Sequence, residues 1–185
     1  MISLDAASVL LQWATGGLFF LWITTRRREV SLGYGWLMRG TYGLMAAGAA
    51  YIGFAVIETD LVRDLSSVGV AVAAFAALAS SVVRRRAGVA GQLELAEARS
   101  ARVAAMTGIE REAATKDTTA REFDPRLDLV APVIGVPGIV AAAVVAADAG
   151  DGSVWLAIAR FVVGALFLGA VSDAMLLGHW YLVQP

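Results

Sequence analysis

The sequence has 185 residues, of which 58% are hydrophobic and 17% are charged, whereas soluble domains average about 45–50% and about 25%. A net charge of −1 gives no reason to expect a nucleic-acid partner, which would require a basic surface. The absence of cysteine excludes disulfides, thiolate metal sites and iron–sulfur clusters. We therefore expect a protein that is partly solvated by lipid and has no nucleic-acid partner.

The first apolar run is predicted to be a retained membrane helix. A cleavable secretory signal carries positive charge before its apolar stretch. Here Asp5 precedes the run, and Arg26, Arg27 and Arg28 follow it. The order of charges therefore indicates a helix with a short tail outside the cytoplasm.

Five apolar runs match the thickness of a bilayer. A hydrocarbon core of about 30 Å requires about 20 helical residues, and the residues that flank these runs are 18 to 21 positions apart. The sequence therefore predicts an all-α, polytopic bundle of about five transmembrane helices in a single membrane domain, residues 1–185. The predicted spans are about 5–25, 39–57, 66–83, 128–147 and 160–181.

The distribution of basic residues predicts the orientation of these spans. With the N-terminus outside and the C-terminus in the cytoplasm, 13 of the 15 basic residues lie on the cytoplasmic side, as the positive-inside rule requires. Arg39 is counted among these inner charges, and Arg63 is placed in an outer loop. Abundant alanine and glycine, with Arg in place of Lys, indicate a bacterial chain. We therefore expect a multi-pass protein of the bacterial cytoplasmic (inner) membrane.

The longest soluble segment is the predicted cytoplasmic loop, residues 84–126. Its composition from Gln92 to Lys116 favours a helix, and Glu112 and Lys116 have a stabilising i,i+4 spacing. A rough apolar stripe is formed by Leu93, Ala96, Val103, Met106 and Ile109. The segment is predicted to be partly helical, and three interpretations remain open: a helix on the membrane surface, a helix on a partner protein, and a solvated hairpin.

Small residues recur every four positions along two of the predicted helices. Such faces allow close packing of membrane helices. They predict tight contacts within the bundle or with another subunit or copy of the chain. The two series are Gly69, Ala73, Ala77 and Ser81, and Gly138, Ala142 and Ala146.

Asp173 is the principal candidate for a functional residue. It follows Arg160 by 13 residues, or about 20 Å of helix, and no basic residue is predicted at its depth. Intramembrane carboxylates are costly and commonly functional. Asp173 is therefore a candidate proton, ion or ion-pair site. The alternative is a carboxyl group near the inner boundary that bonds a hydroxyl such as that of Ser172.

His179 is the sole histidine and a candidate axial ligand. A neutral imidazole can ligate haem iron or chlorophyll-type magnesium, but a single histidine excludes a bis-histidine haem held within this chain. We favour the alternative of an interfacial side chain beside Trp180 and Tyr181. No cofactor is identified from the sequence.

Pro132 and Pro137 are candidates for a helix kink. Each proline removes one helical hydrogen bond, and broken helices form substrate sites in some transporters. A kink tolerated for packing is the favoured interpretation. Elsewhere, Gln12 is predicted to form an interhelical hydrogen bond and Arg160 to extend towards the headgroups.

The sequence contains no phosphate-binding loop, no H-E-x-x-H pattern and no catalytic triad signal. It therefore predicts no catalytic or metal-ligating residue and favours a protein that is not an enzyme. Gln184 and Pro185 directly follow the last predicted helix, so we expect that the natural chain can be longer.

Three functional hypotheses follow from these features. The first is a non-catalytic accessory or structural transmembrane subunit of a larger bacterial complex, such as one of electron transfer or energy conversion, with other membrane subunits or further copies of itself as partners. The second is a small transporter, channel or proton-linked carrier that uses Asp173. The third is a haem- or pigment-binding membrane protein that uses His179.

Overall fold

The computed structural model describes residues 5–27, 30–85, 90–107, 122–150 and 152–183. These residues form helices and no strands, so the predicted all-α class is confirmed. In chain order the helices are α1 (Ala6–Thr25), α2 (Leu32–Ala55), α3 (Leu61–Val83), α4 (Ala90–Thr107), the short 3₁₀ helix η2 (Pro125–Leu129), α5 (Val130–Asp148) and α6 (Val154–Val183).

Within the described residues, four helical segments are long and apolar enough to cross a membrane: α1, α3, the continuous segment of η2 and α5, and α6. Helix α2 has 24 residues but is not among them. It contains six glycines, three tyrosines and Arg39, which lower its mean hydropathy. The five spans predicted from the sequence therefore require that α2 also crosses the membrane.

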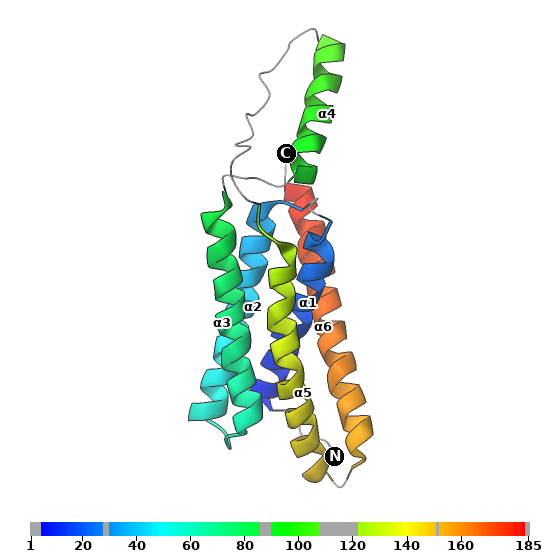
Figure 1. Ribbon diagram of the computed structural model, residues 1–185. Helices are drawn as coiled ribbons and strands as arrows, with labels where there is room; N and C mark the ends of the chain where they lie inside the picture. The colour runs from blue at the N-terminus through cyan, green and yellow to red at the C-terminus, as the bar shows by residue number, and fades with distance from the viewer. Residues whose placement is uncertain (1–4, 28–29, 86–89, 108–121, 151, 184–185) are drawn as a thin grey trace.

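The long helices lie side by side, and α1 occupies the centre of the bundle (Figure 1). Helix α1 packs against α2, α5 and α6, whereas α3 packs against α2 and α5. One end of the bundle, which we call the Asp5 end, contains the start of α1 and the α2–α3 and α5–α6 connections. The opposite end, where η2 leads into α5, is the Asp128 end.

The interior of the bundle is built from small side chains. Most of its buried hydrophobic residues are alanines. A Cβ atom added to Gly16 would collide with the backbone carbonyl of Ala165, and one added to Gly169 would collide with the backbone of Gly16. Helices α1 and α6 are therefore in direct backbone contact at this point, which is the packing that small residues allow in lipid.

Glycines of the predicted small-residue faces of α3 and α5 each lie against the other of these two helices. A Cβ atom on Gly69 would lie 2.7 Å from the side chain of Ile134, and one on Gly138 would lie 2.6 Å from Ser66 Cβ. Ala77, Ala142 and Ala146 are also buried. These faces therefore serve packing inside the bundle.

Large apolar side chains lie on the outside of the helices. Leu44 of α2 is 67% exposed, and Val163 and Phe167 of α6 are 64% and 65% exposed. A surface this apolar is unfavourable in water but matches the hydrocarbon of a bilayer. The distribution of small residues inside and large apolar residues outside is therefore typical of a membrane bundle.

Three helices begin before their predicted spans: α2, α3 and α6, the last at Val154 instead of Arg160. Helix α2 begins seven residues before the predicted boundary, Arg39, and α3 begins at Leu61 instead of Ser66, so that it contains Arg63 and Asp64. The Arg39, Arg63 and Asp64 side chains are buried, and each forms an ion pair. Because paired charges can lie inside a bundle, these residues do not mark its surface.

Helix α4 occupies part of the predicted loop, residues 84–126, and lies beyond the Asp128 end (Figure 1). It extends along the long axis of the bundle instead of across it. The predicted helical segment contains Leu93, Ala96, Val103 and Met106 within α4, whereas Ile109, Glu112 and Lys116 lie outside the described residues.

Candidate functional site: the buried polar cluster around Asp173

Asp173 lies in the interior of the bundle and accepts a hydrogen bond from Tyr34. Its exposed fraction is 3%, and that of Tyr34 is 0%. The Tyr34 hydroxyl donates to Asp173 Oδ1 over 3.0 Å. Within the part of the chain that the structure describes, no basic side chain forms an ion pair with Asp173. The carboxyl group therefore has a neutral hydroxyl as its hydrogen-bonding partner.

The position of Tyr34 also fixes the depth of Asp173. Tyr34 is the third residue of α2, and α6 continues for ten residues beyond Asp173. Asp173 consequently lies near the Asp128 end instead of midway along the bundle. This location resembles the sequence-based alternative of a carboxyl group near the boundary, except that the hydroxyl belongs to Tyr34 and not to Ser172.

Ser172 organises a second set of polar contacts beside Asp173. The Tyr42 hydroxyl and Ser172 Oγ are 2.9 Å apart, and the Trp13 indole donates to the same Oγ atom over 3.1 Å. Ser172 in turn donates to the Leu168 carbonyl over 2.6 Å. Three helices, α1, α2 and α6, are thereby joined at the level of Asp173.

An ion pair between Arg39 and Asp128 lies at the same end of the bundle. Arg39 Nε and Nη2 donate to the two carboxylate oxygens over 2.6 and 2.7 Å, and both side chains are almost fully buried. Thr25 donates to Asp128 Oδ2 over 3.1 Å. The Phe123 ring lies 4.3 Å from the Arg39 guanidinium carbon, a cation–π distance. The pair therefore joins α1, α2 and η2.

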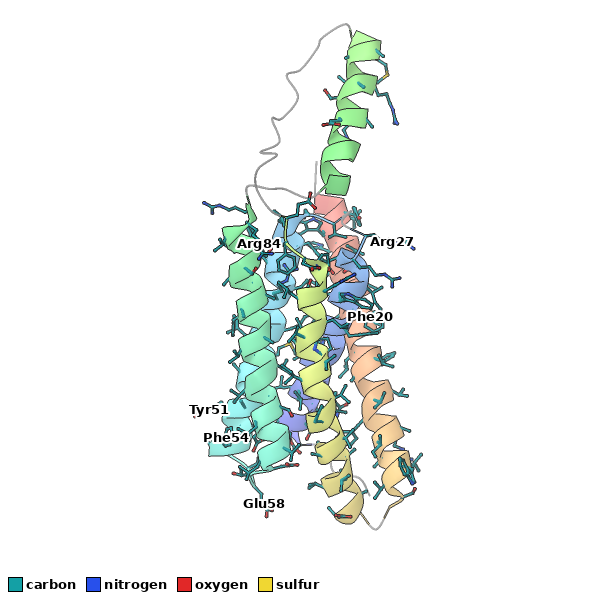
Figure 2. All side chains as sticks on the ribbon, in the orientation of Figure 1. Phe20, Arg27, Tyr51, Phe54, Glu58 and Arg84 are labelled. Carbon is teal, nitrogen blue, oxygen red and sulfur yellow. The ribbon has the colours of Figure 1, made fainter. Side chains whose placement is uncertain are left out.

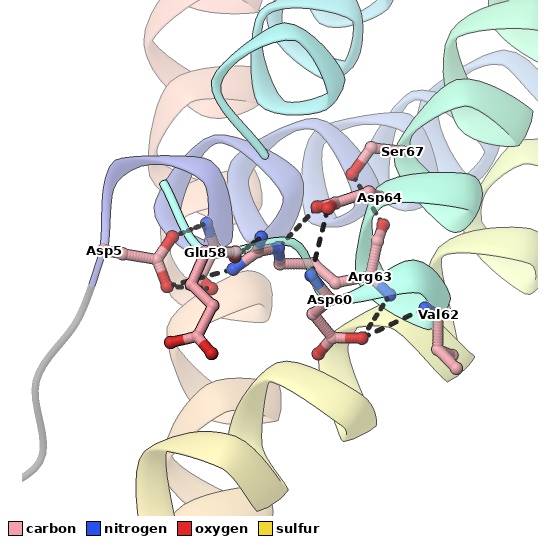
Figure 3. A network of polar contacts seen from close by, with 8 residues as sticks. Asp5, Glu58, Asp60, Val62, Arg63, Asp64 and Ser67 are labelled. Carbon is pink, nitrogen blue, oxygen red and sulfur yellow. Dashed lines mark hydrogen bonds and ion pairs between the residues drawn. The ribbon is translucent and has the colours of Figure 1, made fainter. Parts of the chain in front are cut away.

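A separate network closes the Asp5 end (Figure 3). Arg63 Nε donates to Asp64 over 2.7 Å, and its two terminal nitrogens reach Asp5 and the Glu58 carbonyl over 3.4 and 3.2 Å. Asp5 also caps α1 by accepting from the Ser8 amide over 2.8 Å. The start of α1, the α2–α3 connection and the start of α3 are thereby held together.

The other sequence-predicted candidates do not join the Asp173 cluster. His179 is exposed on α6, six residues beyond Asp173. Pro132 is buried in the first turn of α5, where a missing backbone N–H costs little, and α5 continues as an α-helix through Pro137. No group of three or more His, Cys, Asp or Glu side chains that could hold a metal ion is found among the described residues.

Sequence reasoning missed most of this cluster. It treated Arg39 and Asp128 as boundary charges and did not select Tyr34, Tyr42 or Trp13. The missed signal was their position within apolar runs, since a polar ring or charge inside such a run usually faces the bundle interior. Scans against protein-family models, curated proteins and solved structures found no match to this chain.

Proposed function

We propose that this chain crosses the bacterial cytoplasmic membrane five times, with its N-terminus outside, and that it is a non-catalytic accessory subunit of a larger membrane complex. A complex of electron transfer or energy conversion is the favoured context. The four apolar helical segments support membrane insertion. The observation that carries the accessory role is the position of α4.

The arrangement of charges supports the five-span topology. Arg27 and Arg84 lie at one end of the bundle and Glu58 at the other (Figure 2). Helix α2 connects these ends beside α1, and its 24 residues correspond to about 36 Å. A helix of this length is sufficient to cross a bilayer. Its polar residues Arg39 and Tyr34 are covered by neighbouring helices.

Single-cysteine labelling tests this topology cleanly, because these 185 residues contain no cysteine. We expect Arg27→Cys to react with an impermeant maleimide only from the cytoplasmic side and Glu58→Cys only from the outside. Both positions are exposed. Labelling of both from the same side would contradict a crossing by α2, and labelling in the reverse sense would contradict the proposed orientation.

Helix α4 has few contacts with the other helices in the described part of the chain. It has 18 residues, and no extensive packing joins it to another helix among the described elements. Met106, for example, is 71% exposed. Isolated helices of this length are marginal in water because their stability depends on packing of an apolar face. We propose that the side of α4 that carries Met106 docks on another subunit in the cytoplasm.

The test is gentle extraction followed by native mass measurement. We expect the chain to be recovered with larger subunits in a fixed ratio, and Met106→Glu to release it from them. Ala105→Glu places the same charge at the neighbouring exposed position and should preserve the complex. Recovery of the wild-type chain as a monomer or homo-oligomer would reject the accessory role.

A proton-linked carrier is a second candidate function, favoured by the environment of Asp173. A buried carboxyl group that is bonded to a neutral hydroxyl and not to a cation can exist in both protonation states without leaving an opposite charge unpaired. Asp173 and Tyr34 form such a pair. Proton uptake by proteoliposomes that contain a trapped pH-sensitive dye should be abolished by Asp173→Asn. Unchanged uptake would reject this candidate.

A further inference from the structure

Two polar side chains of α1 are buried in the bundle with atoms that have no hydrogen-bond partner. Gln12 and Thr15 are each 4% exposed, and neither Gln12 Nε2 nor Thr15 Oγ1 forms a hydrogen bond within the described structure. The interhelical bond predicted for Gln12 is therefore not found. The two residues are three positions apart in the helix, so their side chains are neighbours on one side of it.

The depth of these groups increases the cost of leaving them unpaired. Thr15 is the tenth of the 20 residues of α1, so it lies halfway along a helix that is apolar enough to cross a membrane. Lipid tails offer no hydrogen bonds at this depth, and polar side chains of membrane helices commonly bond across helices instead. The Gln12 amide and the Thr15 hydroxyl therefore require a partner that the neighbouring side chains do not supply.

Two glycines of α5 and a serine of α3 face this part of α1. A Cβ atom on Gly135 would collide with the Thr15 side chain, and one on Gly138 would lie 2.9 Å from Leu11 Cδ2 and 3.1 Å from Ser66 Oγ. Helix α5 therefore places no side chain of its own at these two positions. The Ser66 hydroxyl consequently lies near α1 at the residue that precedes Gln12.

The surroundings of this junction limit the size and the charge of a ligand. Leu11 is 0% exposed and Ser66 is 9% exposed, and Gly135 and Gly138 are buried, so only a very small molecule can be enclosed here. The polar groups are an amide and two hydroxyls, all of them neutral. A ligand that accepts a hydrogen bond from the amide and also exchanges hydrogen bonds with hydroxyls has the chemistry of water.

We propose that Gln12, Thr15 and Ser66 bind an internal water molecule at the junction of α1, α3 and α5. Gln12 Nε2 donates to the water oxygen, and the two hydroxyls complete its hydrogen bonds, since each can donate or accept. Internal waters typically form about three hydrogen bonds with polar groups that lack other partners. The water joins α1 to α3 beside the glycines of α5. The site requires only that α1 lies in a bilayer and is independent of the proposed accessory or carrier role.

The first test is radiolytic labelling of the full chain in phosphatidylcholine nanodiscs, in water that carries heavy oxygen, with mass spectrometry of the oxidised residues. Hydroxyl radicals that form from a bound water oxidise the side chains beside it. Leu11 is 0% exposed and lies at the junction, whereas Leu18 is 1% exposed and lies two turns further along α1. We expect heavy oxygen to enter Leu11 several-fold more than Leu18. Equal labelling of the two leucines would overturn the proposal.

The second test is the sign of the effect of Thr15→Val, which replaces the hydroxyl by a methyl group of similar size. If Thr15 binds water, we expect a lower melting temperature in detergent and weaker labelling of Leu11. Gln12→Leu should change both quantities in the same direction. Removal of hydroxyl and amide groups that truly lack partners would instead leave the melting temperature unchanged or raise it, which would contradict the water site. Thr41→Val is the matched control, since Thr41 is exposed on α2, and it should change neither quantity.

Discussion

Arg39 and Asp128 are 89 residues apart in the sequence and form a bidentate ion pair in the interior of the bundle. The pair connects α2 to η2, the turn that directs the chain into α5. Since the side chains are 3% and 0% exposed, neither charge can be solvated if the other is removed. The pair thereby fixes where the chain re-enters the bundle after α4.

Removal of Asp128 should destabilise the protein strongly. In Asp128→Ala the Arg39 charge remains buried without a carboxylate, a change that costs about 3–5 kcal/mol for buried pairs. Unfolding in mild detergent, followed by circular dichroism, should show this loss. The double variant Arg39→Met/Asp128→Leu should be considerably more stable than Asp128→Ala, because no unpaired charge remains. Equal stability of the two variants would contradict a buried ion pair.

Loss of the Tyr34 hydroxyl should destabilise the Asp173 cluster by a smaller amount. Tyr34→Phe leaves the buried carboxyl group without its hydrogen-bond donor, which costs about 1–3 kcal/mol. The aromatic ring is retained, so its edge contact with Trp180 at 6.0 Å between centroids persists. Tyr51→Phe is the matched control, since Tyr51 is 69% exposed and its loss of a hydroxyl should have little effect on thermal unfolding.

Contact between the α1 and α6 backbones should make Gly16 intolerant of any side chain. A Cβ atom there would collide with the Ala165 carbonyl, so Gly16→Ala requires the two helices to separate. We expect a loss of several kcal/mol, about 1–3 for strain alone, or failure to fold. Gly40→Ala is the control, because nothing lies within 4 Å of its added Cβ. That variant should gain up to about 1 kcal/mol.

The fold class could be predicted from local sequence features, whereas the burial and pairing of the charged residues could not. Apolar runs of membrane length predicted helices where α1, α3, α5 and α6 lie, because hydropathy depends on neighbouring residues alone. Arg39, Arg63 and Asp128 were interpreted as surface charges, since an isolated charge is costly in lipid. Their pairing depends on residues brought together by the fold, and a local pattern does not contain that information.

The Asp173 site shows the same division between local and long-range information. Its location within an apolar run identified Asp173 as a buried carboxylate, and the structure places it at 3% exposure. The donor, Tyr34, is 139 residues away and belongs to α2, which is not among the four segments apolar enough to span a membrane. Some of the residues that lower this hydropathy lie at contacts between helices: Tyr42 lies against Gly17 of α1, and Gly43 lies against Phe75 of α3.

The ion pair at the Asp5 end should tolerate mutation better than the pair at the Asp128 end. In Asp64→Ala the Arg63 side chain retains Asp5 at 3.4 Å and the Glu58 carbonyl at 3.2 Å. Asp5 is partly exposed, so water can also reach this side of the network. We expect Asp64→Ala to cost about 1–3 kcal/mol, less than Asp128→Ala in the same detergent. The double variant Asp5→Asn/Asp64→Ala removes both acidic partners and should approach the loss seen at the Asp128 end. If Asp64→Ala alone is already as damaging, Asp5 does not compensate for the missing carboxylate.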